Sequence, residues 1–368
     1  MPPFEFATAG RIVFGAGTFA QLDAIAAQFG KKPLMVTGKR GTGFRVDGEP
    51  TIALIREGVQ AFRDNACEMV IAVGGGSAID AGKAIAAAAA NPGDLLEYLE
   101  VIGQGRSLDA PPYPFIAVPT TAGTGSEVTR NAVLGSPEHG VKVSLRSPLM
   151  LPRVAIIDPE LTRSLPPALT ASTGLDALTQ LIEPYVSLRA NPMTDNFCLD
   201  GIRHAAHSLP RAYANGDDAA ARNDMSWSSL LGGLALANAG LGVVHGFAAP
   251  IGGMFEAPHG AVCAALLAAG IRANIDALRE REPRHPSLDR YRTIARLLTE
   301  DPGAIAEDVP QWIGNLTRQL GVAPLRTWGI DAADIPQLVG KAARASSMKA
   351  NPIALTPAEL TEVVERSL

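Results

Sequence analysis

Two loops rich in small residues have the composition of a phosphate-binding site. The first runs from Gly74 to Lys83, directly after an apolar segment and at the start of a segment with helical spacing. Its glycines would let the backbone come close to a ligand, and the free N–H groups of a first helical turn, together with the helix dipole, favour phosphate. A tight strand-to-helix turn without a ligand is the alternative, because glycine-rich turns are common.

The second loop carries five hydroxyl groups and also follows an apolar segment. Its hydroxyl residues are Thr120, Thr121, Thr124, Ser126 and Thr129. Such a loop suits hydrogen bonding to a polar ligand that bears phosphate, although it could instead merely cap the following helix. The two loops together point more strongly to a ligand than either loop does alone.

A third set of residues could hold a divalent metal ion. Asp176 and Gln180 lie four positions apart in a helical segment and therefore share a face, and His245 and His259 follow later in the chain. A carboxylate, two imidazoles and an amide oxygen are possible ligands, although the amide is a weak and neutral one. Spacing alone leaves the alternative open that these are buried or helix-capping polar residues.

The composition limits the possible partners. The chain has 368 residues, of which 47% are apolar, with 32 basic and 37 acidic side chains and a net charge of −5. This balance is typical of a globular protein and argues against general binding to nucleic acid or to anionic membranes. Three widely spaced cysteines, the lack of a signal-peptide pattern and the lack of an apolar run of about 18 residues predict a cytoplasmic protein. Cys263 follows His259 closely, but we assign it no nucleophilic role.

The first half of the chain alternates buried strands with helices. Apolar strands are expected at 33–37, 69–73, 115–118 and 154–157, and helices at 51–63 and 77–90. Continuous apolar strands separated by helices predict a parallel sheet covered on both faces, with ligands beyond the carboxyl ends of the strands. Both loops lie at such ends.

The second half shows no β pattern after Pro166 and is expected to be helical. Its Ala- and Leu-rich segments span about 168–188, 194–213, 218–239, 261–278, 288–299, 303–320, 334–347 and 356–367. Punctuation of these segments by Pro, Gly and Asn is typical of a helical bundle. We therefore predict an α/β domain over residues 1–158 and an all-α domain over residues 159–368.

One stretch does not fit a regular β-α-β unit. Residues 44–46 resemble a further strand, but only about ten residues separate the strand that ends at Thr37 from Gly48. A parallel crossover needs about a dozen or more connecting residues. Either the crossover is truncated or a segment is absent from the sequence.

Taken together, the motifs resemble the iron-containing (group III) alcohol dehydrogenase family, in order along the chain from Phe14 to Pro352. The resemblance rests on Gly74-Gly75-Gly76-Ser77 with Asp80 and Lys83, Pro119–Thr129, Gly174–Thr179 and Pro258-His259-Gly260. It implies a dehydroquinate synthase-like fold, in which a dinucleotide-binding α/β domain precedes a helical one. It also implies hydride transfer between NAD(P)H and a small alcohol or aldehyde in a cleft between the domains, by a homodimer or larger assembly.

The resemblance implies roles for residues of both loops. Gly75, Gly76 and Ser77 would cradle the cofactor pyrophosphate, Asp80 belongs to the same cofactor-binding motif, and the hydroxyl residues of the second loop would line the nicotinamide side. Lys142 would reach the ribose hydroxyls and is a predicted catalytic residue.

Gly38 departs from the pattern of many NAD-using members, which carry Asp directly after this strand. Glycine leaves room for a 2′-phosphate, and Lys39 and Arg40 could pair with it. The sequence therefore favours NADP over NAD, with a solvated basic loop as the alternative.

The resemblance also implies a metal site in the helical half. The four metal-ligand positions of the family are occupied by Asp176, Gln180, His245 and His259. Fe²⁺ or Zn²⁺ held there would polarise the substrate oxygen as a Lewis acid, so the two histidines are also predicted catalytic residues. Two imidazoles of the family are missing, because Gln180 and Ala249 replace histidines.

Two alternatives to an alcohol dehydrogenase or aldehyde reductase stay open. One is an enzyme like maleylacetate reductase, which would need a cation for its dicarboxylate, and Arg130 is the candidate. The other is a nucleotide-binding protein that has lost catalysis, which the two missing imidazoles motivate.

Overall fold

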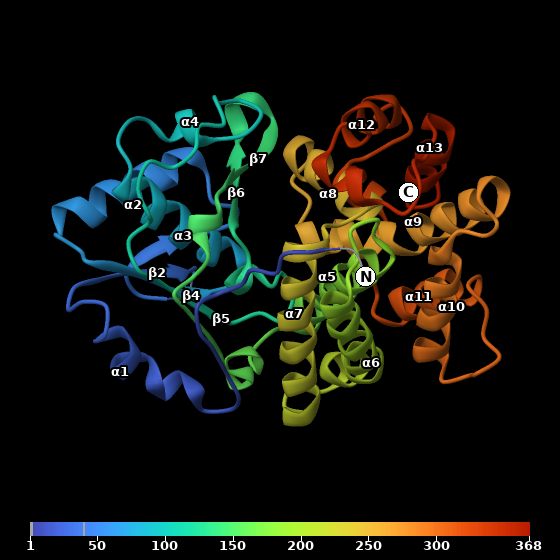
Figure 1. Ribbon diagram of the computed structural model, residues 1–368, viewed down its shortest axis with the longest axis horizontal. Helices are drawn as coiled ribbons and strands as arrows, with labels where there is room; N and C mark the ends of the chain where they lie inside the picture. The colour runs from blue at the N-terminus through green and yellow to red at the C-terminus, as the bar shows by residue number, and fades with distance from the viewer. Residues whose placement is uncertain (1–2, 40) are drawn as a thin grey trace. The chain divides into compact units, whose positions relative to one another are not determined.

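The computed structural model describes residues 3–39 and 41–368, which form two compact units. One unit comprises Ala7–Ser164, and the other comprises Leu165–Leu368 with the start of the chain up to Phe6. Figure 1 colours the first unit mainly blue to green and the second green to red. Arg40 lies outside the described residues, and the domain boundary after Asp158 stays a prediction.

A six-stranded parallel sheet forms the centre of the first unit, with strand order β1-β8-β5-β4-β2-β3. Its strands are β1 (Ile12–Phe14), β2 (Pro33–Gly38), β3 (Phe44–Val46), β4 (Met69–Gly74), β5 (Phe115–Pro119) and β8 (Val154–Ile157). The parallel sheet predicted from the apolar runs is confirmed, and β1 is a further strand that the sequence analysis missed. The first polar loop follows β4, and the second follows β5.

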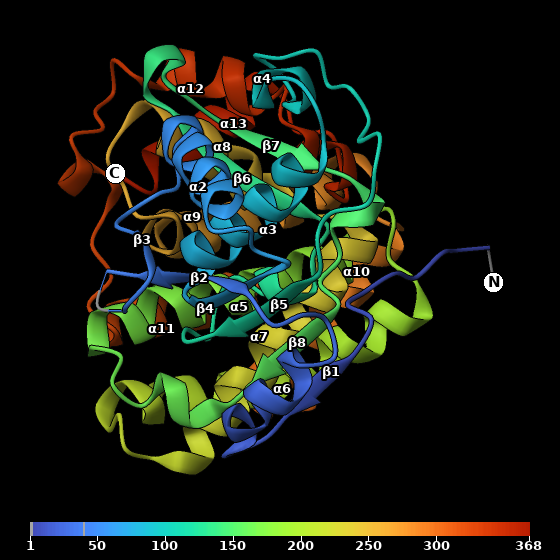
Figure 2. The same cartoon turned by 90° about the vertical axis from the view of Figure 1, so that its left-hand side faces the viewer.

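Helices cover both faces of this sheet, as Figure 2 shows. On one face, α2 (Ile52–Asp64) and α3 (Gly76–Ala90) bury Ile55 and Ile85 against the sheet. On the other face, the short helix α1 (Leu22–Ala26) contributes to a second apolar cluster. Apolar residues at helical spacing form these buried faces, which is why the helices could be predicted.

No helix occurs among the described residues that connect β2 to β3. Only five residues separate the two strands, yet they pair in parallel with Val36 opposite Phe44 and Gly38 opposite Val46. The backbone turns back directly after β2, where the N–H of Gly41 donates to the carbonyl of Gly38 at 3.0 Å. The expected strand at 44–46 is present, and it pairs with β2 through a connection too short for a regular crossover.

An antiparallel hairpin follows the second loop and was not predicted. It pairs β6 (Asn131–Ser136) with β7 (Val141–Arg146) and turns through Gly140, whose φ is +59°. Valine, valine and leucine alternate with polar residues along β7, and this period of two could have identified the strand. Lys142 lies on β7.

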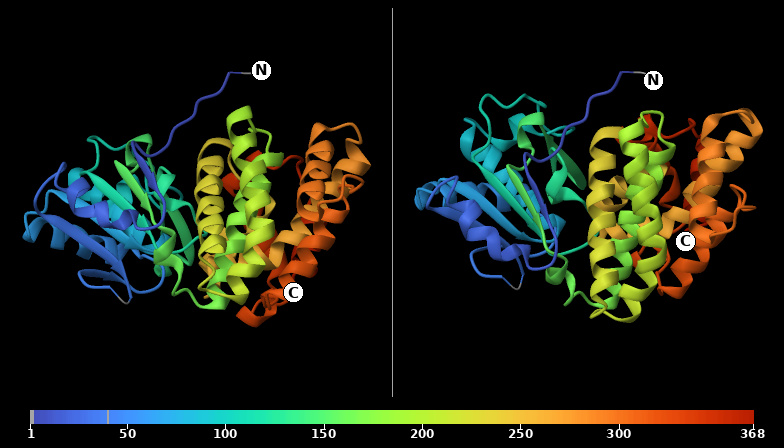
Figure 3. Two further views of the ribbon diagram at one scale, coloured as in Figure 1. Left: turned by 90° about the horizontal axis from the view of Figure 1, so that it is seen from below. Right: turned by 60° about the horizontal axis from the view of Figure 1, so that its bottom comes forward.

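The second unit is helical, and no strand occurs in its described residues. Its longer helices are α5 (Pro167–Val186), α6 (Pro192–Ala214), α7 (Ala219–Ala239), α8 (Val243–Met254), α9 (His259–Arg281), α10 (Pro286–Thr299), α11 (Asp308–Gln319), α12 (Ile335–Ala342) and α13 (Pro357–Glu365). Three of them, α5, α6 and α7, pack side by side (Figure 3). The predicted all-α half is confirmed, although the sequence analysis missed α8.

Helix α9 is long and apolar enough to cross a membrane by length and composition, which the sequence analysis did not expect. However, 72% of its most apolar window is buried inside the protein. This is the burial of a core helix, whose apolar residues pack against its neighbours. The helix pair α7 and α8 passes the same test only together, and it bends by 97° between the two helices.

Candidate functional site

The first loop presents the amino end of α3 without a side-chain cap. Gly75 occupies the N-cap position, and no described side chain accepts a hydrogen bond from the first turn. A Cβ atom on Gly76 would lie 2.7 Å from the Thr124 Cγ2 atom, so the two loops touch and a larger residue at position 76 would force Thr124 to move. Uncapped N–H groups at the start of a 15-residue helix form a potential phosphate site.

A buried network organises the second loop. The ammonium group of Lys83 donates to the carbonyl of Ser126 and to Oγ1 of Thr129, each at 2.9 Å, and to the carbonyl of Asn131. It also pairs with Asp80 at 3.2 Å. Asp80 accepts hydrogen bonds from Oγ of Ser126 and from a backbone N–H of β6. Three predicted cofactor residues, Asp80, Ser126 and Thr129, therefore hold the loop and the hairpin together.

Burial perturbs two charged groups in this network. Glu127 is 2% exposed, and burial raises its pKa to about 7, although Lys83 lowers the pKa in part. Burial lowers the pKa of Lys83, since it disfavours the charged ammonium, and the attraction of Asp80 offsets this lowering only in part. The sequence analysis gave neither residue a role. Glu127 could have been singled out, because it is a charged residue within a loop of otherwise small and polar residues.

The remaining predicted cofactor residues surround the ends of β2, β4 and β5. The backbone N–H of Thr120 donates to the carbonyl of Gly74 at 2.9 Å, and Thr121 lies against Gly75. Ser77 lies in the first turn of α3. No atom of the described residues lies within 4 Å of the place where a Cβ on Gly38 would be.

Two of the predicted cations already have acidic partners. The ammonium group of Lys142 lies 2.8 Å from a carboxylate oxygen of Glu49, and that of Lys39 lies 3.2 Å from Asp47. Lys142 is nearly buried, whereas Lys39 is exposed. A ligand phosphate or hydroxyl would therefore compete with these carboxylates for each cation.

Three helices of the second unit bring the predicted metal ligands together. Asp176 lies on α5, His245 on α8 and His259 at the start of α9. The Asp176 Oδ1 atom is 3.4 Å from Nε2 of His245 and 3.8 Å from Nε2 of His259. Cys263, one turn further along α9, joins them. This is the one group of three or more His, Cys, Asp or Glu side chains with metal-binding geometry in the described part of the chain.

Gln180 contacts this group through Asp176. Its amide nitrogen donates to Oδ2 of Asp176 at 3.0 Å, as the shared helix face predicts. The Oδ1 atom of Asp176 and the Oε1 atom of Gln180 are buried, and neither has a hydrogen-bond partner among the described residues. Unpaired buried oxygens are costly unless something else satisfies them, so this donor set fits a cation.

Glu183 orients His245 and was missed by the sequence analysis. One carboxylate oxygen lies 2.7 Å from Nδ1 of His245, and the other accepts from the backbone N–H of Val244 at 2.7 Å. The neighbouring N–H of Val243 donates to the side chain of Asn351 at 3.0 Å. Glu183 and Asn351 therefore cap the start of α8. With Nδ1 held by Glu183, Nε2 of His245 is left facing Asp176.

Charges within the group shift its pKa values. Burial lowers the pKa of His245, but attraction to Cys263, Asp176 and Glu183 raises it well above 6.5. Attraction to Cys263 and then Asp176 raises the pKa of His259 to about 9. Burial raises the pKa of Asp176, yet the two histidines lower it by more. Without a metal ion, the group therefore retains protons that a metal would displace.

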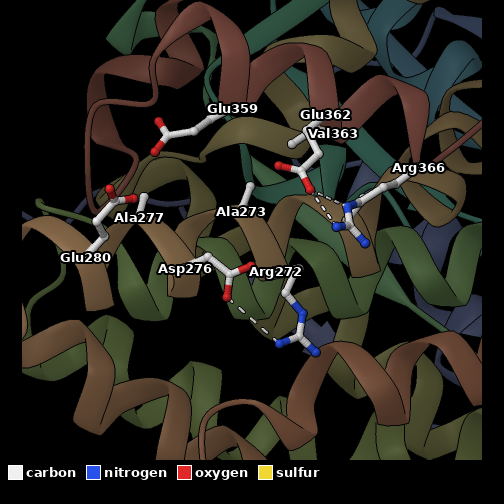
Figure 4. A pocket seen from close by; sticks show the side chains of 10 residues that line it. Arg272, Ala273, Asp276, Ala277, Glu280, Glu359, Glu362, Val363 and Arg366 are labelled. Carbon is white, nitrogen blue, oxygen red and sulfur yellow. Dashed lines mark hydrogen bonds and ion pairs between the residues drawn. The ribbon is translucent and has the colours of Figure 1, made fainter.

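His204, His207 and a separate pocket lie elsewhere in the second unit. His204 pairs with Asp224 at 3.1 Å, and His204 and His207 belong to no metal-binding group of the described residues. A pocket of about 110 Å³ lies between α9 and α13 (Figure 4). Its carboxylates Asp276 and Glu362 face Arg272 and Arg366 in ion pairs, so much of its charge is internally neutralised.

Comparison with known proteins identifies relatives over the whole chain. Residues 9–159 match the family model described as iron-containing alcohol dehydrogenase, and residues 170–368 match its C-terminal domain. A 1,3-propanediol dehydrogenase of Klebsiella pneumoniae is 39% identical over 313 residues, which cover 83% of this chain and 78% of the relative.

Solved structures agree with this relationship. A crystal structure of 1,3-propanediol oxidoreductase superposes with a TM-score of 0.90 at 34% identity, covering 100% of both chains. A sulfoacetaldehyde reductase from Bifidobacterium kashiwanohense, solved in complex with NAD⁺, superposes with a TM-score of 0.87 at 29% identity, covering 100% of this chain and 99% of the other.

Proposed function

The chain belongs to the iron-containing alcohol dehydrogenase family and is an oxidoreductase that acts on alcohols, and on this basis we propose the chemistry of its site. The proposed reaction is hydride transfer between NAD(P)H and a small alcohol or aldehyde, and the helical unit would hold a divalent metal ion. The observation that carries this proposal is the convergence of Asp176, His245 and His259, whose ligand atoms lie within 4.8 Å of one another. Gln180, which the sequence predicts as the fourth ligand, contacts this group through Asp176.

The helices of the second unit supply the electrophilic side of the reaction. Asp176, His245 and His259 would hold an Fe²⁺ or Zn²⁺ ion, which would supply Lewis-acid polarisation of the substrate oxygen. Glu183 fixes the ring of His245 through Nδ1, so that Nε2 is available to the ion. Gln180 holds Asp176 through Oδ2, which keeps Oδ1 directed at the histidines. These contacts preorganise the ligands and reduce the reorganisation that metal binding requires.

The loops of the first unit supply the cofactor side. We assign the pyrophosphate to Gly75, Gly76 and Ser77, because the amino end of α3 lacks a side-chain cap in the described structure. Thr120, Thr121 and Thr124 remain the candidates for the nicotinamide side. We assign Asp80, Ser126 and Thr129 to binding through the loop shape that they maintain with Lys83.

The preference for NADP over NAD stays a proposal. The lack of a described neighbour where a Cβ on Gly38 would lie supports it, because a 2′-phosphate needs that room. To bind the phosphate, Lys39 would have to break its ion pair with Asp47. Lys142 would reach the ribose only by leaving Glu49. We expect NADPH to be the better reductant in a direct comparison with NADH.

The substrate class follows from the relatives and from the metal chemistry. Relatives named for 1,3-propanediol and for 4-hydroxybutyrate support short alcohols and aldehydes, including those with a second polar group. Maleylacetate remains an alternative, for which half-buried Arg130 is the candidate cation. We also propose a cytoplasmic enzyme that assembles as a homodimer or larger.

The test is oxidation of NADPH and of NADH by the purified protein with short aldehydes, 3-hydroxypropanal and maleylacetate. Each assay is run as purified, after chelation, and after Fe²⁺ or Zn²⁺ is returned. We expect turnover that is lost on chelation and recovered with metal. Turnover that chelation leaves unchanged would contradict the metal-assisted chemistry, and cofactor binding without turnover would support the non-catalytic alternative.

A further inference from the structure

Cys263 is placed to bind the same metal ion. It lies four residues after His259 on α9 and therefore on the same face of the helix. Its sulfur is buried, 3.7 Å from Nε2 of His259 and 3.9 Å from Nε2 of His245. The four ligand atoms of Asp176, His245, His259 and Cys263 all lie within 4.8 Å of one another.

These separations are close to those of a tetrahedral site. Metal–nitrogen and metal–oxygen bonds of about 2.05 Å and metal–sulfur bonds of about 2.3 Å place nitrogen about 3.4 Å from oxygen and about 3.6 Å from sulfur. The observed nitrogen–oxygen separations are 3.4 and 3.8 Å, and the nitrogen–sulfur separations are 3.7 and 3.9 Å. Four of the six separations therefore agree with a tetrahedral site to within a few tenths of an ångström, and all six are at most 4.8 Å.

We propose that the thiolate of Cys263 is the fourth ligand of this metal ion, and that Gln180 is a positioning residue that acts through Asp176. The inference rests on the proposed metal site and names a ligand that replaces the imidazole missing at Gln180. On binding, the thiol proton leaves to solvent and a sulfur lone pair forms the metal–sulfur bond, with no change of oxidation state.

The chemistry of the two candidates favours sulfur. A thiolate is a charged, soft ligand that binds Zn²⁺ and Co²⁺ strongly, whereas an amide oxygen is neutral and weak. The amide nitrogen of Gln180 is already committed to Oδ2 of Asp176. The sulfur of Cys263, by contrast, faces the nitrogen atoms of both histidines. The donor set therefore selects a borderline divalent ion such as Zn²⁺ over Mg²⁺ or Ca²⁺.

The experiment is optical spectroscopy of the full-length protein titrated with Co²⁺ after removal of its metal. A thiolate ligand gives a near-ultraviolet sulfur-to-cobalt charge-transfer band, and the visible d–d bands report binding independently. We expect both in the wild type, in Gln180→Ala and in the matched control Cys198→Ser, whose buried sulfur lies on α6. Cys263→Ser should lose the charge-transfer band and bind Co²⁺ at least about 10-fold more weakly.

A second measurement needs no variant and covers the case in which Cys263→Ser fails to fold. X-ray absorption of the wild-type zinc protein should contain one sulfur scatterer at about 2.3 Å. A zinc shell of nitrogen and oxygen alone, or a charge-transfer band that survives in Cys263→Ser, would overturn the proposal while leaving the metal site intact. Failure of the wild type to bind Co²⁺ at all would refute the metal site itself, and this inference with it.

Discussion

Glu127 should destabilise the first unit at neutral and alkaline pH. Burial raises its pKa from 4.5 to about 7, and this rise already includes the opposing attraction of Lys83. Folding therefore favours the protonated form. The carboxyl group has little effect on stability below about pH 4.5, lowers stability progressively as pH rises to about 7, and exerts its full penalty above that value. At about 1.4 kcal/mol per pKa unit, the penalty is about 3 kcal/mol.

Replacing Glu127 with glutamine keeps the shape of the protonated side chain and removes the penalty. We therefore expect Glu127→Gln to raise the free energy of unfolding by about 3 kcal/mol at about pH 8.5 and to change it little at about pH 4.5. Hydrogen exchange of the amides in β4 and β5 measures the opening of this unit separately from the helical unit. Glu138→Gln, at an exposed position of the same unit, is the matched control and should change neither value.

Two outcomes would refute this reasoning. An equal effect of Glu127→Gln at both pH values would mean that protonation of Glu127 does not control stability. A loss of stability at high pH would mean that the ionised carboxylate is held by favourable contacts.

Three further predictions concern the two sites. Glu183→Gln should weaken Zn²⁺ binding by about 10- to 100-fold in chelator competition, because one amide oxygen cannot accept from both His245 and the backbone N–H of Val244. The control Glu307→Gln should leave Zn²⁺ affinity unchanged. Unchanged affinity in Glu183→Gln would contradict its orienting role. Gly76→Ala should weaken NADPH binding about 10-fold or more by fluorescence titration, because the added Cβ pushes against Thr124 and relieving that contact costs about 1–3 kcal/mol. The control Gly340→Ala, where a Cβ meets no described atom, should leave NADPH binding unchanged. Zn²⁺ affinity should rise with pH up to about 9, because His259 must lose its proton to bind, and equal affinities at pH 6.5 and 8.5 would count against that ligand.

The main architecture was predictable because local patterns encode it. The apolar runs of β4 and β5 and the helical spacing from Ile52 onward are signals that no tertiary contact needs to complete. The hairpin was encoded equally well in the alternation along β7. It was missed because continuous apolar runs identify strands buried on both faces, whereas β7 is buried on only one face. The connection between β2 and β3 is shorter than parallel crossovers normally require. No local pattern could therefore have predicted that these two strands pair in parallel.

The metal-binding group was predictable only in part. Three pairs of these residues share a helix face because of their spacing. They are Asp176 with Gln180, Asp176 with Glu183 seven residues later, and His259 with Cys263. Those pairs were readable from spacing. The approach of α8 to α5, which brings His245 between Asp176 and Glu183, depends on packing within the helical unit and is not visible in any spacing.

The most direct test of the account is a crystal structure of the purified protein with Zn²⁺, with anomalous diffraction measured on both sides of the zinc absorption edge. We predict one strong anomalous peak bonded to Asp176, His245 and His259, with the sulfur of Cys263 as the fourth ligand. A peak at any other place in the chain, or no peak at a zinc concentration that supports turnover, would contradict the central claim that these helices hold the metal.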